Sequence, residues 1–236
     1  MAESLLEISN LNAYYGKSHV LQGIDLRVNS GELVVVIGRN GMGKTTLMRA
    51  VLGLQPVRRM GNIVFDGRET VKKPTHEIAA MGIGYVPQGR LLFPSLTVDE
   101  HLQFAFRKKK ESQWTLDAVY ELFPELKNRA GVGGARLSGG EQQMLAIGRA
   151  LVTNPTLLMM DEPSEGLAGI VIQRVEQACR HLISRGMAIV LVEQNLEMAQ
   201  ALADRAYIFY NGRIAYEAPG DLFRKNREKL GSYLGI

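Results

Sequence analysis

The stretch "GRNGMGKTT" at residues 38–46 decides the fold of this chain, because an apolar run, "VVVI" (34–37), leads straight into it. It fits the pattern G-x-x-x-x-G-K-[ST], and a helical pattern continues beyond it from Leu47 to Leu52. Glycines let backbone N–H groups close around oxyanions, and the positive end of the following helix points at the same place. The sequence predicts a phosphate-binding loop here; the simpler alternative is a glycine-rich turn without a ligand.

Each residue type in this loop suits a nucleotide. Lys44 supplies a point charge to the outer phosphates, and the hydroxyl of Thr45 suits Mg²⁺. The residues expected to bind ATP are Gly38, Arg39, Asn40, Gly41, Met42, Gly43, Lys44, Thr45 and Thr46.

Working outward, short apolar runs alternate with helical patterns. Such runs are typical of strands covered on both faces, and the alternation predicts an α/β fold with a mainly parallel sheet. The predicted strands are 5–8, 34–37, 62–67, 82–88, 156–161, 187–192 and 206–210. The segments "LNAYYG" and "IDLRV" predict an antiparallel addition, and 97–123 is mostly helical. We expect one domain, 1–236, with its core in 1–88 and 138–236 and a helical subdomain at about 89–137.

Bulk composition is that of an ordinary globular protein, with 236 residues, 46% hydrophobic residues and a net charge of +4. This charge gives no strong basic face and disfavours a nucleic-acid partner; the basic run 107–110 is expected to be a surface turn. Neither a signal peptide nor a membrane-spanning run is expected. Cys179 is expected to pack in a helix, and 221–236 to form an amphipathic tail helix on the body.

The run "LLMMDE" ends in two carboxylates, Asp161 and Glu162, at the end of a predicted buried strand. Buried carboxylates are costly unless a metal or water uses them. We expect Asp161 to hold Mg²⁺ through water and Glu162 to orient or deprotonate an attacking water. The alternative for Asp161 is a cap on the next turn.

A second anion site is predicted where "RLSGGEQQ" (136–143) opens a helix with Ser138, two glycines and Glu141. One nucleotide needs only one such cradle. The second would therefore close on a nucleotide held by another copy, in a head-to-tail dimer with two ATP molecules between the subunits. The alternative is a capping box that serves only its own helix.

These three motifs, "GRNGMGKTT", "LSGGEQQ" and "LLMMDEPS" in that order, resemble the core motifs of the ABC ATPases, and the likeness spans essentially the whole chain. The resemblance implies a P-loop NTPase fold with a helical signature subdomain. It implies that Tyr15 stacks on adenine, the alternative being a core tyrosine, and that Gln88 touches Mg²⁺ and the attacking water. The residues that it implies for ATP contact across the dimer are Ser138, Gly139, Gly140 and Glu141.

Two positions depart from the family pattern. The usual switch histidine is replaced by Gln194, and a common aspartate of the loop after Glu162 by Ala168. Gln194 can donate an amide hydrogen bond to a γ-phosphate but cannot relay a proton, so we expect Glu162 to carry hydrolysis; Gln194 could instead be a passive strand-end amide. The four histidines are expected to be surface or packing residues: His19, His76, His101 and His181.

With both departures, the chain resembles the ATPases of importers for branched-chain and other hydrophobic amino acids, with urea or amide importers as the alternative. The resemblance implies a second ATPase subunit (the same or a sister chain), membrane permeases, indirectly a periplasmic binding protein, and a peripheral position on the cytoplasmic face of the inner membrane. Rival functions are a soluble non-transport ABC ATPase, a phosphotransferase and a non-hydrolysing binder. The apolar loop with Arg90, Leu91, Leu92, Phe93 and Pro94 is expected either to receive a permease helix or to tuck under the helical subdomain.

Overall fold

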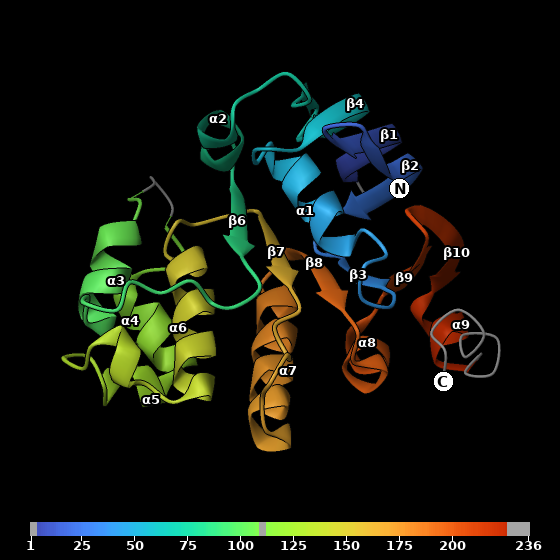
Figure 1. Ribbon diagram of the computed structural model, residues 1–236. Coiled ribbons are helices and arrows are strands. Elements are labelled where there is room, and N and C mark those ends of the chain that lie inside the picture. The colour runs from blue at the N-terminus through green and yellow to red at the C-terminus, as the bar shows by residue number, and fades with distance from the viewer. Residues whose placement is uncertain (1–3, 109–111, 226–236) are drawn as a thin grey trace.

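A six-stranded sheet forms the centre of the protein, seen here in a computed structural model that describes residues 4–108 and 112–225 (Figure 1). All its neighbouring strands run parallel except the last pair, β9 and β10. In spatial order the strands are β10 (Arg213–Pro219), β9 (Arg205–Tyr210), β3 (Leu33–Ile37), β8 (Ala188–Glu193), β7 (Leu157–Asp161) and β6 (Ile83–Val86). The predicted mainly parallel α/β sheet is confirmed.

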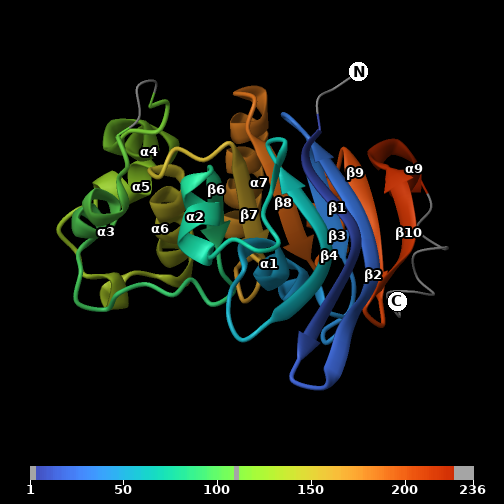
Figure 2. The same ribbon diagram turned by 90° about the horizontal axis from the view of Figure 1, so that it is seen from above.

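A second, antiparallel sheet flanks the central one, as predicted from the first part of the sequence (Figure 2). Its order is β2 (Ser18–Asn29), β1 (Ser4–Tyr15), β4 (Arg58–Phe65) and β5 (Arg68–Glu69). The predicted strand 5–8 is only the first part of β1, because the chain continues extended through "LNAYY" and pairs with both β2 and β4.

The continuous apolar runs are explained by a core on each face of the central sheet. In β3, Val34 and Val36 pack toward the antiparallel sheet and α1 (Lys44–Leu52), whereas Leu33, Val35 and Ile37 pack on the opposite face. On that face the sheet is covered by α7 (Gly169–Ser184) and α8 (Leu196–Leu202). Since successive side chains of a strand point to opposite faces, both sets must be apolar.

A group of helices lies at one end of the molecule, away from the β9–β10 hairpin (Figures 1 and 2). It contains α3 (Val98–Ala105), α4 (Leu116–Leu122), α5 (Pro124–Lys127) and the 3₁₀ turn η1 (Gly134–Arg136). The next helix, α6 (Gly139–Leu151), packs on the same group: a Cβ on Gly148 would lie 2.8 Å from Val119 of α4. The glycine therefore permits this close helix contact.

Two short helices complete the described chain, α2 (Thr75–Ala80) and α9 (Gly220–Lys225). The predicted tail helix 221–236 is described only as far as Lys225, and Lys109 and Lys110 of the basic run also lie outside the described residues. Cys179 is buried in α7 as expected, and burial raises the pKa of its thiol to about 12. Within the described parts of the chain, no helix has the length and apolar character needed to cross a membrane.

Of the four histidines, only His101 is fully buried; the other three are exposed. The backbone N–H of Phe93 donates to Nε2 of His101 over 2.9 Å. Nδ1 of His101 therefore carries the proton and donates it to the carbonyl of Thr97 over 2.7 Å. Burial lowers the pKa of His101, and the charge of Arg149 acts in the same direction; the Thr97 carbonyl and Glu100 oppose it. The loop before α3 is thus anchored on a neutral imidazole.

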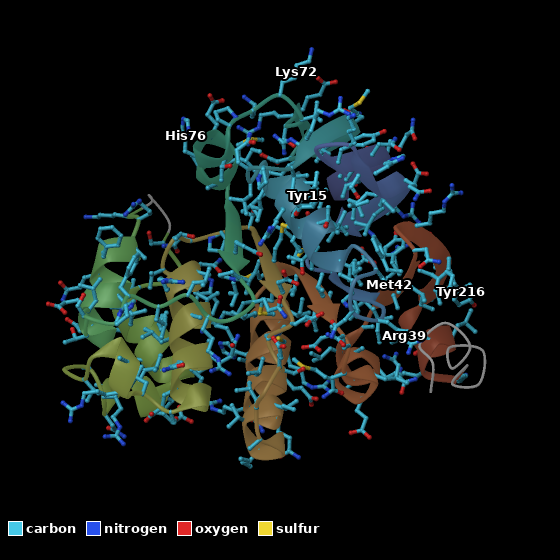
Figure 3. All side chains as sticks on the ribbon, in the orientation of Figure 1. Tyr15, Arg39, Met42, Lys72, His76 and Tyr216 are labelled. Atoms are coloured by element: carbon cyan, nitrogen blue, oxygen red, sulfur yellow. The ribbon has the colours of Figure 1, made fainter. Side chains whose placement is uncertain are left out.

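We predict that His101 makes folding less favourable in mild acid. Its folded pKa lies below the unfolded value of about 6.5, so the unfolded chain binds more protons between the two values, and stability falls as pH drops through this window. Chemical denaturation at about pH 7.5 and pH 5 should show a smaller pH dependence of the unfolding free energy for His101→Gln than for the wild type. His76→Gln, on the outer side of α2 (Figure 3), is the control and should keep the wild-type dependence. An unchanged pH dependence in His101→Gln would contradict the assignment.

Candidate functional site

The predicted phosphate loop lies between the end of β3 at Ile37 and the start of α1 at Lys44. Gly41 and Gly43 have φ angles of 78° and 104°, which side-chain-bearing residues rarely adopt. No side chain caps the start of α1, so the first amides of the helix are available for hydrogen bonding to a ligand. The positive end of the helix dipole lies at the same place. This arrangement suits a phosphate anion.

The turn between β9 and β10 braces this loop from the side, a contact that the sequence analysis missed. The N–H groups of Asn211 and Gly212 donate to Sδ and the carbonyl of Met42, over 3.2 and 3.1 Å (Figure 3 labels Met42). Gly212 also accepts from the N–H of Gln22, and a Cβ at this position would lie 2.0 Å from the carbonyl oxygen of Val20. The Asn-Gly pair, a common hairpin-turn signal, was the available clue.

Lys44 lies at the centre of the site and is buried. Its Nζ donates to the carbonyls of Gly38 (2.7 Å) and Arg39 (3.0 Å) and forms an ion pair with Oε1 of Glu162 at 3.0 Å. The lysine therefore joins the loop after β3 to the loop after β7.

Asp161 ends β7 and is almost completely buried. Its two oxygens accept from the hydroxyls of Thr45 (3.3 Å) and Tyr85 (3.4 Å). Burial raises its pKa to about 6, with a smaller contribution from the charge of Glu162. A carboxylate beside a threonine hydroxyl at a phosphate loop matches the hard oxygen ligands that Mg²⁺ prefers, so these residues fit that ion.

Glu162 follows Asp161 and has a left-handed backbone, with φ of 49°. Its N–H donates to the carbonyl of Val192 at the end of β8, which holds this conformation. Such strained residues occur at functional sites when their surroundings enforce them. The side chain is buried and meets three donors: Lys44, Gln194 (2.7 Å) and Gln88 (3.3 Å).

The two glutamines reach Glu162 from different strand ends. Gln88 follows β6 and also donates to Glu165 over 2.9 Å. Gln194 follows β8 and also donates to Oδ1 of Asn40 in the phosphate loop. The structure thus brings together five predicted residues: Lys44, Gln88, Asp161, Glu162 and Gln194.

Glu193 is a functional candidate that the sequence analysis did not identify. It is the last residue of β8 and is 1% exposed. Its carboxylate accepts four hydrogen bonds: from N–H and Oγ of Ser164 and from the N–H groups of Gln194 and Asn195. Burial raises its pKa, and these donors oppose the shift. A charged residue at the end of the apolar run "AIVLV" was the available signal.

Tyr15 ends β1 beside α1, and Arg49 of that helix donates to its hydroxyl over 3.4 Å (Figure 3). The tyrosine is half-buried and packs against the core between the sheets, and its contact with adenine stays a prediction. Its neighbour Tyr14 stacks on His19 instead.

The second loop forms the capping box that was its simpler interpretation. Ser138 accepts from the N–H of Glu141 (3.3 Å), and the Glu141 carboxylate accepts from the N–H of Ser138 (2.8 Å). The amides of Gly139 and Gly140, at the first two helical positions, have no intrahelical acceptor. Among the described residues, no hydrogen bond or ion pair joins this loop to the phosphate loop of the same chain. Ala168, at the start of α7, provides no side-chain cap.

Comparison with known proteins agrees with this geometry. The profile of the family described as "ABC transporter" matches residues 21–165. The high-affinity branched-chain amino acid transport ATP-binding protein BraG of Pseudomonas aeruginosa is 43% identical over 98% of this chain and all of its own length. The probable branched-chain amino acid transport ATP-binding protein LivF of Archaeoglobus fulgidus is 36% identical, over 96% of this chain and 98% of the relative.

Solved structures show the same fold. An ATP-binding subunit of an ABC transporter superposes with a TM-score of 0.82 at 27% identity, covering 98% of this chain and all of the other. A dimeric ATP-binding cassette with ADP and Pi, in a post-hydrolysis state, superposes with a TM-score of 0.78 at 25% identity, over 91% of this chain and 98% of the other. The chain therefore belongs to the ABC transporter family, as one of its ATP-binding, ATP-hydrolysing subunits.

Proposed function

We propose that this ATPase powers an importer for branched-chain or other hydrophobic amino acids, using Glu162 as the base that activates water. The cargo is inferred from the names of the relatives BraG and LivF, which align over nearly the whole chain. The observation that carries the catalytic assignment is the convergence of Lys44, Gln88 and Gln194 on the one carboxylate of Glu162.

In the proposed reaction, a water molecule attacks the γ-phosphorus of ATP and gives a proton to Glu162, the bond to the β-phosphate oxygen breaks, and ADP and phosphate result. A general base of this kind typically contributes 10²–10⁴-fold. Lys44 exchanges its carboxylate partner for the β- and γ-phosphates, which leaves Glu162 free to accept the proton. Gln194 donates its amide N–H to a γ-phosphate oxygen and to Glu162, which orients the carboxylate.

Thr45, Asp161 and Gln88 are the proposed residues for Mg²⁺. When bound, the ion would neutralise charge that develops during phosphoryl transfer. Thr46 and the remaining loop residues contribute backbone amides, and Tyr15 contributes a ring face for adenine.

Members of this family form ATPase dimers, and the proposal extends this to a head-to-tail dimer here. The amides of Gly139 and Gly140 have no acceptor among the described residues, which supports the proposed role of Ser138, Gly139, Gly140 and Glu141 on the nucleotide of the opposite subunit. The subunit would act with permeases and a periplasmic binding protein, on the cytoplasmic face of the membrane.

The loop after Gln88 is the proposed permease contact. Leu91 and Phe93 are 65% and 47% exposed, and Phe104 of α3 is a third exposed apolar residue, whose ring meets the ring of Phe93 edge-on. Leu92, in contrast, packs on the core, so the loop divides its apolar residues between both expected roles. Arg149 of α6 donates to the carbonyls of Leu91 and Arg90, which links this surface to the signature helix.

Glu162→Gln should lower kcat for ATP hydrolysis by about 10²–10⁴-fold, because an amide cannot accept the proton of water. Gln194→Ala and Gln194→His should each retain measurable turnover, since they alter only a hydrogen-bond donor. Steady-state phosphate release measures all three. If the Gln194 variants lost all ATP turnover while Glu162→Gln stayed active, Gln194 and not Glu162 would be the residue on which hydrolysis depends.

The same Glu162→Gln variant should form a dimer in saturating Mg-ATP, because uncleaved nucleotide holds contacts from both subunits. Sedimentation velocity with and without Mg-ATP, alone and with a sister ATPase chain, provides the measurement. Adding Ser138→Arg should prevent the dimer without preventing fluorescent-ATP binding. A protein that stays monomeric under every condition would exclude the dimer.

Replacing Leu91 or Phe93 with Asp should abolish co-purification with the permeases while the ATPase rate of the isolated subunit stays within about two-fold, because exposed side chains contribute little to folding. Leu222→Asp is the matched control, since Leu222 is 49% exposed on α9 at the opposite end of the molecule. Co-purification of the Leu91 and Phe93 variants at wild-type levels would argue against this surface.

A further inference from the structure

We infer that Glu193 is a positioning residue for ATP hydrolysis: it holds the loop that carries Glu162 and the loop that carries Gln194 in one fixed arrangement. This rests on the proposed roles of Glu162 and Gln194. Among the described residues, Glu193 forms no hydrogen bond or ion pair with Lys44 or with the rest of the phosphate loop.

The hydrogen bonds of Glu193 are distributed over two loops. Oε1 accepts from the N–H of Ser164 over 3.0 Å, and Oε2 accepts from Oγ of Ser164 over 2.8 Å. Oε2 also accepts from the N–H groups of Gln194 and Asn195, over 3.1 and 3.2 Å. The side chain of Glu193 therefore connects both loops. In one loop it binds Ser164, two residues after Glu162, and in the other it binds the backbone of Gln194 and Asn195.

Burial makes this clamp specific for a carboxylate. Glu193 is 1% exposed and Ser164 is 7% exposed, so water does not replace a lost partner easily. An ionised carboxylate only accepts hydrogen bonds, and each of its two oxygens here faces at least one donor, one at Oε1 and three at Oε2. In the Glu193→Gln variant, an amide nitrogen would replace one of the two oxygens and would face at least one N–H or O–H donor whichever way the amide turns.

The consequence for catalysis follows from the short distance between the two loops. Nε2 of Gln194 lies 2.7 Å from Oε2 of Glu162. The backbone N–H of Glu162 donates a hydrogen bond to the carbonyl of Val192, the residue before Glu193. Loosening the clamp would shift the base relative to the donor. A misplacement of about 1 Å can cost roughly 10²-fold in rate without loss of binding.

The test compares Glu193→Gln with the wild type in the full-length protein. We expect kcat to fall by about 10- to 100-fold, while the KM for ATP and the Kd for a fluorescent ATP analogue stay within about three-fold. Ser164→Ala, which removes one of the four donors, should give a smaller loss in kcat.

Glu32→Gln is the matched control. Its carboxylate also accepts a backbone N–H, from Asn29 over 2.8 Å, and it precedes β3 at the opposite end of the sheet. We expect this variant to keep the wild-type kcat even where its melting temperature falls as much as that of Glu193→Gln.

A double variant distinguishes positioning from general weakening of the fold. In single-turnover assays, Glu193→Gln should cause little further loss when Glu162→Gln is already present, because there is no longer a base to position. Three results would each overturn the inference. Glu193→Gln could keep the wild-type kcat, it could lose kcat and nucleotide affinity equally, or it could add its full loss to that of Glu162→Gln in the double variant. Failure of the proposed function is separate, since it would appear as retained turnover in Glu162→Gln alone.

Discussion

The buried ion pair between Lys44 and Glu162 is the interaction on which the site depends. The two side chains are only 3% and 6% exposed, and charges removed from water to this degree are costly unless further hydrogen bonds satisfy them. Lys44 also donates hydrogen bonds to the carbonyls of Gly38 and Arg39. The carboxylate of Glu162 also accepts hydrogen bonds from the side-chain amides of Gln88 and Gln194. The pair is thus a structural link between the loop after β3 and the loop after β7.

The parallel sheet makes this convergence possible. Parallel strands bring their carboxyl ends to one edge, so the loops after β3, β6, β7 and β8 meet although they are far apart in sequence. Strand register sets the heights at which they meet: Ile37 lies opposite Glu193, and Asp161 opposite Val192. A slip of one residue would turn every side chain at this edge to the other face.

A short series of polar contacts connects Glu162 with the loop that carries the exposed residues Leu91 and Phe93. Gln88 contacts both Glu162 and Glu165, and the guanidinium of Arg90 contacts Glu165 and Gln142 of α6. The same segment has three consecutive residues with positive φ, Gly89, Arg90 and Leu91, before its exposed apolar tip. Arg90 and Leu91 thus have backbone conformations that side-chain-bearing residues rarely adopt, and polar contacts of Arg90 and Arg149 hold the segment in place.

Much of this protein was determined by local sequence. The phosphate loop, the acidic pair and the alternation of apolar runs with helices each depend on residue type and period over fewer than about twenty residues. The alternation predicted the α/β fold correctly, and the two motifs lie at strand ends as expected. The tertiary structure alone decided that Leu92 turns inward while Leu91 and Phe93 face out, that Asn211 and Gly212 brace Met42, and that Glu193 joins two loops. These contacts connect residues from different strands, and their existence depends on sheet order and register, which the periodicity of a single segment does not specify.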